Sequence, residues 1–322
     1  MSTNIIEREP CCDEVITPKV TAEGVAVANK EFRTGHVVLI GEPNVGKSSL
    51  VNKIVGEQVS VVTDVPGTTR EQIRGIKSTD EYQIIFLDTP GMYKGRTSLD
   101  RYMAKCISCS MAEANVIVYV LDATDIKDEF IQKIKNYKKT EKPLILVINK
   151  TDRTSYEKLY PQLAKLSGIT FIKEIIPTSC KSGENIRLLE HEISKYLPMA
   201  PPIHDQDFYT MTDVRRISEE IIRGELLKVL RAELPHGIAV NVVKWKDTDK
   251  ETKIDVEIYC LKQSHKPIII GKKGAVLKKI GIESRKQIEK MLGKHVKLYT
   301  HVLVRENWKD KKDMLEKLGY TS

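Results

Sequence analysis

The chain has 322 residues, 41% hydrophobic and 30% charged, a balance typical of soluble globular domains with apolar cores. Its apolar runs stay well below the roughly 20 residues of a membrane-spanning helix, and six cysteines are too few for a disulfide framework in a chain of this size. Of the net charge of +8, most lies in residues 205–322, which hold 25 Lys and Arg against 18 Asp and Glu. This asymmetry predicts a polyanionic partner for that part, either nucleic acid or an anionic membrane.

The chain begins with residues 1–34, which we interpret as a flexible N-terminal extension. The segment lacks the apolar core of a secretory signal peptide, and four acidic residues within its first 14 positions argue against a transit peptide. Cys106 and Cys109 form a single C-x-x-C pair without the second pair that a zinc site would need. We interpret them as two small helix residues and expect an intracellular protein.

Residues 35–198 alternate short apolar runs with amphipathic segments. The apolar runs, rich in Val, Ile and Leu, predict buried strands at 36–41, 84–88, 116–122, 144–149 and 175–179. Helical spacing predicts helices at 47–55, 99–112, 129–138, 156–166 and 184–196. Continuously apolar strands that alternate with helices are typical of a mostly parallel sheet covered on both faces. We therefore expect an α/β domain with a doubly wound sheet.

The three prolines within residues 198–202 predict a semi-rigid linker, which we place at 199–210. Beyond it, the order of elements changes to that of a smaller α+β domain, residues 211–322. Its predicted elements are a helix at 213–232, strands at 237–245 and 253–261, a helix at 275–291, a strand at 296–304 and a final helix at 308–318.

Residues 41–48 read Gly-Glu-Pro-Asn-Val-Gly-Lys-Ser, which fits the phosphate-binding pattern G-x-x-x-x-G-K-[ST] between a predicted strand and a predicted helix. The glycines let successive backbone N–H groups point at phosphate oxygens, and the helix N-terminus adds partial positive charge. Lys47 is expected to reach the β- and γ-phosphates, and the Ser48 hydroxyl to bind Mg²⁺. The expected nucleotide-binding residues of this segment are Gly41, Asn44, Val45, Gly46, Lys47, Ser48 and Ser49.

The sequence Asp88-Thr89-Pro90-Gly91 ends the second predicted strand and supplies four further binding residues. Asp88 is placed to hold Mg²⁺ through a water molecule, and the Gly91 N–H to sense the γ-phosphate. Between this sequence and the phosphate loop, residues 63–70 contain two consecutive threonines in a Gly/Pro-rich stretch that suits a switch segment. We expect Thr69 to join Mg²⁺ when the γ-phosphate is present, with Thr68 as the alternative. The expected catalytic residues are Lys47, Thr69, Asp88 and Gly91.

The sequence Asn149-Lys150-Thr151-Asp152 ends a later strand and predicts guanine as the base. The Asp152 carboxylate can accept hydrogen bonds from N1–H and the 2-amino group of guanine, neither of which adenine offers. Asn149 would bond the opposite edge of the base, and the Lys150 stem would cover its face. The backbone of Ser179, Cys180 and Lys181, after the last strand, can bond the guanine oxygen. The expected ligands are therefore GTP or GDP with Mg²⁺.

The residues that follow Gly91 are Met92 and Tyr93, so no Gln stands where Ras-like enzymes orient the attacking water. Slow intrinsic hydrolysis is expected. We hypothesise that Asn44 helps to coordinate a monovalent cation, with K⁺ as the candidate, which supplies the charge of an arginine finger.

In the second domain, an apolar run leads to Gly271-Lys272-Lys273-Gly274, followed by a predicted helix. In a KH module, a G-x-x-G loop clamps the backbone of about four nucleotides. The surrounding residues 262–297 hold 11 Lys and Arg against 2 Asp and Glu. RNA binding is the interpretation we favour, although residue types alone do not distinguish it from DNA binding. The expected RNA-binding residues are Gly271, Lys272, Lys273, Gly274, Lys278 and Lys279.

These motifs in this order resemble the Era family of GTPases, in which a G domain precedes a type II KH domain. The matching segments are 41–48, 68–70, 88–91, 149–152, 232–235, 270–274, 280–286 and 318–320. Cys180 departs from the family, which usually has Ala there, and a backbone contact should tolerate the change. The resemblance covers nearly the whole span from Gly35 to Tyr320.

The resemblance implies a GTP-hydrolysing switch that binds the 3′ end of small-subunit (16S-type) ribosomal RNA and assists assembly of a 30S-type pre-ribosomal subunit. It also implies a monomer in the cytoplasm with peripheral contact to the bacterial inner membrane, while the N-terminal extension leaves an organellar location open. The main alternative is a membrane-associated regulatory GTPase that uses its basic domain for lipid or another RNA. A pure RNA-binding module is disfavoured by the complete nucleotide motifs, and an RNA-modification GTPase by the lack of length for another catalytic domain.

Overall fold

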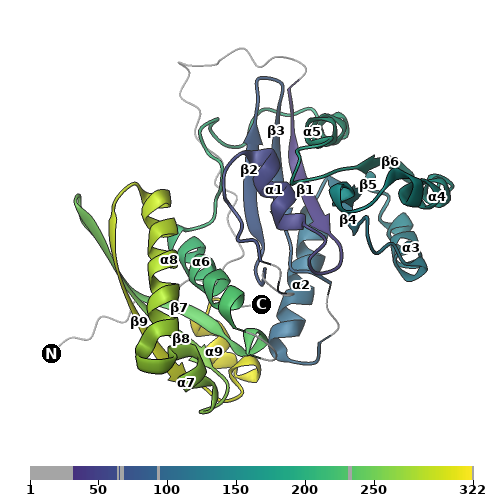
Figure 1. Cartoon of the computed structure of the whole chain (residues 1–322). Helices are drawn as coiled ribbons and strands as arrows, with labels where there is room; N and C mark the ends of the chain where they lie inside the picture. Colours follow the sequence, from purple (N-terminus) through teal and green to yellow (C-terminus); the bar gives the residue numbers. More distant parts are fainter. Residues whose placement is uncertain (1–31, 64, 66–68, 93–94, 231–233, 321–322) are drawn as a thin grey trace, which may run out of the picture. The chain divides into compact units, whose positions relative to one another are not determined.

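The computed structural model describes residues 32–320, apart from 64, 66–68, 93–94 and 231–233. Within this part of the chain there are two sheets, one of six strands and one of three (Figure 1). Nearly all of the predicted N-terminal extension lies outside the described residues.

The first sheet has the strand order β2-β3-β1-β4-β5-β6. Its strands are β1 (Arg33–Ile40), β2 (Ile73–Ser78), β3 (Tyr82–Asp88), β4 (Val116–Asp122), β5 (Leu144–Asn149) and β6 (Ile172–Pro177). Neighbouring strands are parallel except β2 and β3, which are antiparallel. The predicted mostly parallel sheet is confirmed. The sequence did not predict β2, because Arg74 and Lys77 interrupt its apolar run, as is usual at a sheet edge.

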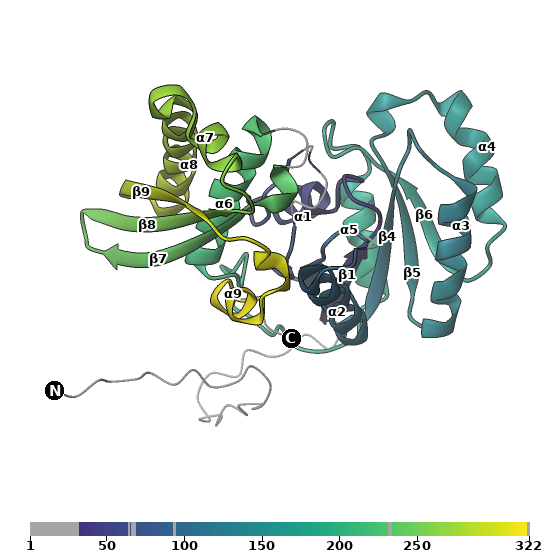
Figure 2. The same cartoon turned by 90° about the horizontal axis from the view of Figure 1, so that it is seen from below.

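Alternate residues of the central strands pack into two different cores, one on each face of the sheet. In β1, Val37 and Leu39 belong to one core, and Val38 and Ile40 to the other, as the two-residue period of a strand requires. Helices α1 (Lys47–Val55) and α5 (Ile186–Lys195) close the first core. The helices on the second face are α2 (Ser98–Glu113), α3 (Asp128–Lys135) and α4 (Tyr156–Ser167) (Figure 2). The doubly wound α/β arrangement is therefore confirmed.

The second sheet has the order β7-β8-β9, with β7 and β8 antiparallel and β8 and β9 parallel. Its elements are α6 (Val214–Val229), β7 (Ala239–Asp247), β8 (Glu251–Cys260), α7 (His265–Ile270), α8 (Ala275–Leu292), β9 (His295–Val304) and α9 (Lys312–Lys317). Helices α6 and α8 lie side by side (Figures 1 and 2) and share one apolar core with the strands. This is the predicted smaller α+β domain.

Most predicted boundaries lie within three residues of the observed ones, but two elements differ in kind. The single helix predicted at 308–318 is a 3-10 turn at Trp308–Asp310 followed by the short helix α9. The apolar run before the G-x-x-G loop is the helix α7, which the sequence did not predict. Six residues are too few to show a helical period.

The predicted linker follows the edge of the first sheet. The buried side-chain amide of Gln83 accepts hydrogen bonds from the backbone N–H groups of Ile203 and His204 and donates to the His204 carbonyl. Further along, the Ile76 N–H donates to the Tyr209 carbonyl at 2.9 Å. These bonds hold residues 203–209 against the sheet and fix where α6 begins.

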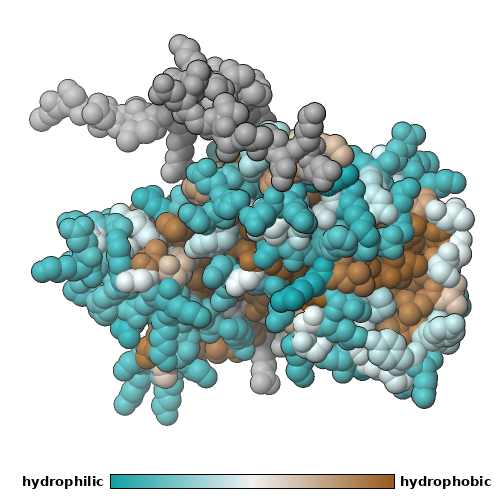
Figure 3. Space-filling view, turned by 90° about the horizontal axis from the view of Figure 1, so that it is seen from above, coloured by the Kyte–Doolittle hydropathy of each residue, from teal (hydrophilic) through white to brown (hydrophobic). Residues whose placement is uncertain are grey.

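Hydrophilic side chains cover most of the described surface visible in Figure 3, with apolar residues gathered along its middle. Among the described residues, no helix combines the length and apolarity needed to cross a membrane.

Candidate nucleotide site and basic groove

The loops that follow β1, β3, β5 and β6 meet at the carboxyl edge of the first sheet, where α/β proteins commonly bind ligands. They surround a cavity of about 1050 Å³. The predicted residues that line it are Asn44, Gly46, Lys47, Ser48, Ser49, Thr69, Gly91, Asn149, Lys150, Asp152, Cys180 and Lys181. Folding thus brings these four loops, and Thr69 from the segment between α1 and β2, to one cavity.

Lys47 is held inside the curl of the phosphate-binding loop. Its ammonium group donates to the carbonyl oxygens of Gly41 at 3.1 Å and Glu42 at 3.0 Å. The side chain is only 6% exposed, and burial lowers the pKa of Lys47 to about 8, although the charge of Asp88 opposes this shift. The two hydrogen-bond partners of this buried ammonium are neutral carbonyls. A phosphate would give it an anionic partner.

Gly46, directly before α1, has a φ of 100°, a backbone conformation that favours glycine. A Cβ at this position would lie 2.2 Å from the side-chain nitrogen of Asn149. Asn149 uses that nitrogen to donate to the Val45 carbonyl at 2.9 Å. The phosphate loop and the base loop are therefore in direct contact, and a side chain at residue 46 would push them apart.

Asp88, at the end of β3, is fully buried, and neither of its carboxylate oxygens forms a hydrogen bond within the described residues. Burial raises its pKa, with Ser48 and Lys47 opposing. The Ser48 hydroxyl lies 3.2 Å from the Thr69 hydroxyl. Buried carboxylate oxygens beside the Ser48 hydroxyl, with the Thr69 hydroxyl on the other side of Ser48, fit the oxygen-ligand chemistry of Mg²⁺, which commonly keeps its own waters.

The residues of the base loop are fixed by contacts at both of its ends. The Lys150 ammonium donates to the Asn44 carbonyl at 2.5 Å and to a carboxylate oxygen of Asp122 at 2.6 Å. The side-chain oxygen of Asn149 accepts from the Cys180 N–H at 3.3 Å. Lys150 is one of the residues that line the cavity, and these bonds hold its ammonium group in place.

The Ser179 hydroxyl donates to one carboxylate oxygen of Asp152 at 2.6 Å. Asp152 lines the cavity, whereas Ser179 does not. Ser179 therefore orients the carboxylate from behind while the other oxygen stays available to a ligand.

Several predicted binding residues support the cavity without lining it, namely Gly41, Val45, Asp88, Thr89, Pro90 and Ser179. The Thr89 hydroxyl, for example, donates to the Leu39 carbonyl at 2.7 Å and ties β3 to β1. Thr68, the alternative switch residue, lies outside the described residues.

The sequence did not predict the part of the cavity wall that comes from the end of α1 and the following loop. Its lining residues are Asn52, Lys53, Glu57, Gln58, Val61, Val62 and Thr63. Asn52 holds this loop, because its side chain accepts from the Val59 and Ser60 N–H groups and donates to the Ser60 carbonyl. No local pattern predicts this contact, because it forms only when the loop folds back on the helix.

A second cavity of about 610 Å³ lies between α8 and β9. The residues that line it are Gly274, Leu277, Lys278, Gly281, Ile282, Arg285, His295, Val296, Lys297, Leu298, Tyr299 and Thr300, and we call it the basic groove. Of the predicted RNA-binding residues, Gly274 and Lys278 line it, and Gly271, Lys272, Lys273 and Lys279 do not. The sequence pattern did not indicate Lys297 and Tyr299, because strand residues give no local signal of facing a groove.

The glycines of the G-x-x-G loop both have positive φ, 75° at Gly271 and 77° at Gly274. A Cβ at Gly271 would lie 2.4 Å from a methyl group of Val276 in α8. The loop can therefore approach the start of α8 closely only with glycine there.

A phosphate loop, a buried acid beside two hydroxyls and a guanine-type base loop define a P-loop GTP-binding protein, here joined to a second α+β domain with a basic groove. Family models agree on both halves. Residues 36–150 match the 50S ribosome-binding GTPase model, and residues 233–309 match the KH domain model.

Curated relatives extend the match over nearly the whole chain. GTPase Era of Clostridium acetobutylicum is 41% identical over 290 residues, which is 90% of this chain and 98% of the relative. GTPase Era of Clostridium novyi is 41% identical over 293 residues, which is 90% of this chain and 99% of the relative. The chain therefore belongs to the Era family of GTPases and hydrolyses GTP.

Solved structures of Era agree with the fold. An Aquifex aeolicus Era variant bound to GDP and AlF₄⁻ matches with a TM-score of 0.86 at 35% identity, covering 90% of this chain and all of that one. Era in complex with MgGDPNP and nucleotides 1506–1542 of 16S ribosomal RNA matches with a TM-score of 0.85 at 36% identity and the same coverage. The second domain is accordingly a KH domain.

Proposed function

We propose that this GTPase binds GTP with Mg²⁺ in the 1050 Å³ cavity, binds small-subunit ribosomal RNA in the basic groove, and assists assembly of a 30S-type pre-ribosomal subunit. The observation that carries the proposal is the meeting of phosphate-type residues (Lys47, Ser48) and base-type residues (Asn149, Asp152) around one cavity. The solved Era complex with MgGDPNP and 16S ribosomal RNA supports both ligands.

In this proposal the phosphate end of the cavity is built by the chain's own charges. Lys47 exchanges its two carbonyl partners for phosphate oxygens, and the N–H groups of residues 44–49 add fixed donors that need no rearrangement. Gly91, which lines the cavity, offers its N–H to the γ-phosphate. Catalysis then rests mainly on positioning and charge stabilisation rather than on a protein nucleophile.

Ser48, Thr69 and Asp88 would hold the metal, Asp88 through a water molecule. Their fit rests on the unpaired buried carboxylate and the 3.2 Å between the two hydroxyls. When bound, Mg²⁺ neutralises charge on the β- and γ-phosphate oxygens. Of these three residues, only Thr69 lies on the switch segment. We therefore expect the position of Thr69 to change when the γ-phosphate is present.

The base end of the cavity recognises guanine through Asp152. Its carboxylate is exposed in the free site and oriented by Ser179; a bound adenine would cover it without offering a donor to its second oxygen, a penalty larger than the gain from one good hydrogen bond. The Cys180 backbone would contribute through its N–H, which in the free site donates to the Asn149 side chain, so the thiol in place of the family's usual Ala is compatible with binding. Burial raises the pKa of Cys180 to about 11, which keeps the thiol neutral beside the base.

A monovalent cation near Asn44 is part of the proposal. Asn44 lies in the phosphate loop with a φ of 63° and lines the cavity, which places it at the phosphate end of the site. We expect hydrolysis to be several-fold faster in KCl than in NaCl. Equal hydrolysis rates in KCl and NaCl would show that hydrolysis does not depend on K⁺ and would refute this part of the proposal.

For the RNA, the basic groove offers Lys278, Arg285 and Lys297 to phosphates and Tyr299, which is 49% exposed, to a base. The G-x-x-G loop at the start of α8 adds its backbone and Lys272 and Lys273. In single-stranded RNA sites, cationic side chains typically bind the phosphates of the RNA backbone and an aromatic ring stacks on a base.

We also propose the chain's division into the extension 1–34, the G domain 35–198, the linker 199–210 and the KH domain 211–322. A cytoplasmic location follows from the ribosomal role. Peripheral membrane contact would use the same basic surface, and sedimentation with anionic vesicles in the presence and absence of RNA tests it. If added RNA does not reduce the amount of protein that sediments with the vesicles, the membrane contact uses a different surface from the RNA.

The deciding experiment measures nucleotide preference in the full chain with Mg²⁺. We expect GTP to be preferred over ATP by orders of magnitude, and Asp152→Asn to lose GTP while gaining XTP, whose ring carries an oxygen in place of the 2-amino group. Glu157→Gln, which changes an exposed carboxylate on α4 that does not line the cavity, is the control and should keep GTP. An unchanged preference in Asp152→Asn would refute the proposed base recognition.

A further inference from the structure

The segment that carries Thr69 contacts the KH domain on both of its sides. The switch segment predicted at residues 63–70 lies between Val61 and Glu71, and its residues 64 and 66–68 are outside the described residues. Between them, Thr69 is 8% exposed and its hydroxyl lies 3.2 Å from that of Ser48.

The first anchor is apolar. Val61 is buried and belongs to the core cluster of the KH domain together with Ile217 and Ile221 of α6, although it lies in the G domain sequence. α6 approaches it closely at Gly224, where a Cβ would lie 2.5 Å from a Val61 methyl group. Burial of this valine side chain stabilises the contact, so it holds the start of the segment.

The second anchor is the guanidinium of Arg70, the residue next to Thr69. It is 5% exposed and donates to the Ile238 carbonyl at 2.6 Å and the His236 carbonyl at 3.5 Å. Its carbon lies 5.5 Å from the ring centroid of Trp308, a distance suited to a cation–π contact. A buried guanidinium with these partners fixes the backbone one residue from the Thr69 hydroxyl.

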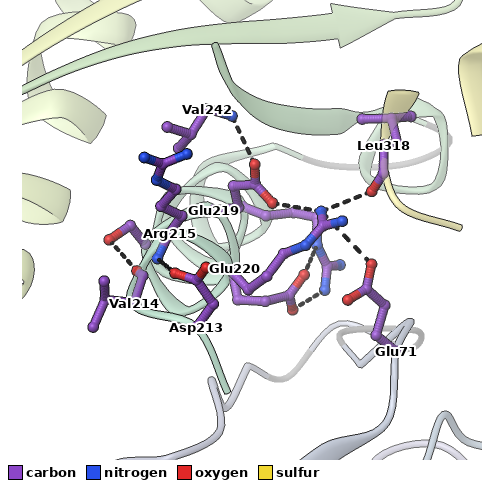
Figure 4. Close-up of polar contacts among 11 residues, drawn as sticks. Glu71, Asp213, Val214, Arg215, Glu219, Glu220, Val242 and Leu318 are labelled. Carbon is purple, nitrogen blue, oxygen red and sulfur yellow. Dashed lines mark hydrogen bonds and ion pairs between the residues drawn. The ribbon is translucent and has the colours of Figure 1, made fainter. Parts of the chain in front are cut away.

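A third contact extends this anchor. Glu71 lies 3.8 Å from the guanidinium of Arg216 on α6. Arg216 is itself held by Glu219 at 2.8 Å and by the Leu318 carbonyl at 2.7 Å, and Glu219 accepts from the Val242 N–H (Figure 4). The KH domain therefore presents a fixed cation to the switch segment.

Resting on the proposed function, we infer that Arg70 and Arg216 are positioning residues for Thr69, and that the KH domain thereby sets the affinity of the site for the triphosphate. Neither arginine lines the nucleotide cavity. Because Thr69 is the ligand that distinguishes the triphosphate state, loss of either anchor should weaken GTP binding and leave GDP binding nearly unchanged. By linkage, the same loss should reduce the effect of the nucleotide on RNA affinity.

The test compares Arg216→Gln with Arg215→Gln in the full chain. Arg215 is the exposed neighbour on the same helix and points away from the Glu71 cluster in Figure 4, so the pair matches in charge change. Equilibrium binding of GDP and of a non-hydrolysable GTP analogue is measured across a Mg²⁺ titration. We expect Arg216→Gln to weaken the analogue about fivefold, to raise the Mg²⁺ concentration needed for half-maximal analogue binding, and to change GDP affinity less than twofold. Arg215→Gln should match the unmodified chain.

Glu71→Gln is the second variant and removes the other partner of the pair. It should reproduce the effect, and the double variant with Arg216→Gln should be no weaker than either single one. Equal losses for GDP and the analogue would identify a purely structural contact and overturn the inference, as would unchanged affinities in both variants. If the unmodified chain itself shows no Mg²⁺-dependent preference for the analogue over GDP, the proposed role of Thr69 fails instead.

Discussion

The Thr151 hydroxyl donates to a carboxylate oxygen of Glu184 at 2.8 Å and also lies 3.0 Å from the Thr178 carbonyl. Thr151 belongs to the base loop after β5, whereas Glu184 belongs to the loop after β6. The Ser179 N–H donates to the Glu184 carbonyl, so the residue that orients Asp152 is tied to the same point. Two loops that are far apart in the sequence are joined directly behind the proposed guanine site.

We therefore expect Glu184→Ala to weaken GTP binding about fivefold, since one buried hydrogen bond contributes about 1 kcal/mol. Thr151→Val, which keeps the shape and removes the hydroxyl, should have a similar effect. The ratio of GTP to ITP affinity should also fall, because ITP lacks the 2-amino group that Asp152 recognises. Tyr156→Phe is the control. The Tyr156 ring is exposed, and its hydroxyl donates to the other carboxylate oxygen of Glu184, the one that Thr151 does not use. An unaltered GTP/ITP ratio in both inner variants would mean that the two loops are positioned independently.

The lowered pKa of Lys47, about 8, predicts that GTP affinity depends on pH. Below pH 8 the ammonium is already charged in the free protein. Above pH 8 it is mostly neutral, so binding a phosphate requires uptake of a proton, and affinity should fall by up to about tenfold per pH unit. Calorimetry at pH 8.5 in two buffers of different ionisation enthalpy should detect this uptake, and at pH 7 it should be absent. Guanosine, which lacks phosphates, serves as the comparison and should show no uptake.

Burial raises the pKa of Glu71 to about 7, with Arg216 opposing. The charged and titratable groups around it are Arg216, Glu219, Glu220 and Arg223 of α6, Tyr102 and Cys106 of α2, and Tyr320. Because the folded state holds this proton more tightly than the unfolded chain, the contribution of Glu71 to stability is fully present below about pH 4.5. It is lost as the pH rises to about 7.

The free energy of unfolding should therefore fall between about pH 5 and pH 7 by more in the unmodified chain than in Glu71→Gln, which cannot titrate. Urea titrations at several pH values measure this difference. Glu57→Gln, at an exposed position, is the control and should preserve the pH dependence. Parallel curves for the unmodified chain and Glu71→Gln would show that Glu71 titrates normally in the folded state.

Elements with a strong local signal could be predicted from the sequence, and contacts between distant segments could not. The motif at residues 41–48 needs only its own glycines and lysine, and α1 begins and ends where its apolar spacing predicted. The edge strand β2 was missed because charged residues break its apolar pattern. Burial of Arg70 against Ile238 joins residues 168 positions apart, and no property of either residue alone indicates the other.

The same distinction separates the lysines of α8. The sequence predicted both Lys278 and Lys279 as RNA ligands, but the helix places only Lys278 on the basic groove, because neighbours on a helix point about 100° apart. We expect Lys278→Gln to reduce affinity for single-stranded RNA and to lower the slope of log affinity against log salt by about 0.7, as loss of one phosphate contact requires. Lys279→Gln should leave the slope nearly unchanged, and Lys290→Gln, in the last turn of α8, is a further control. Equal slopes for Lys278→Gln and Lys279→Gln, measured by fluorescence anisotropy with a short RNA, would place the RNA outside the groove.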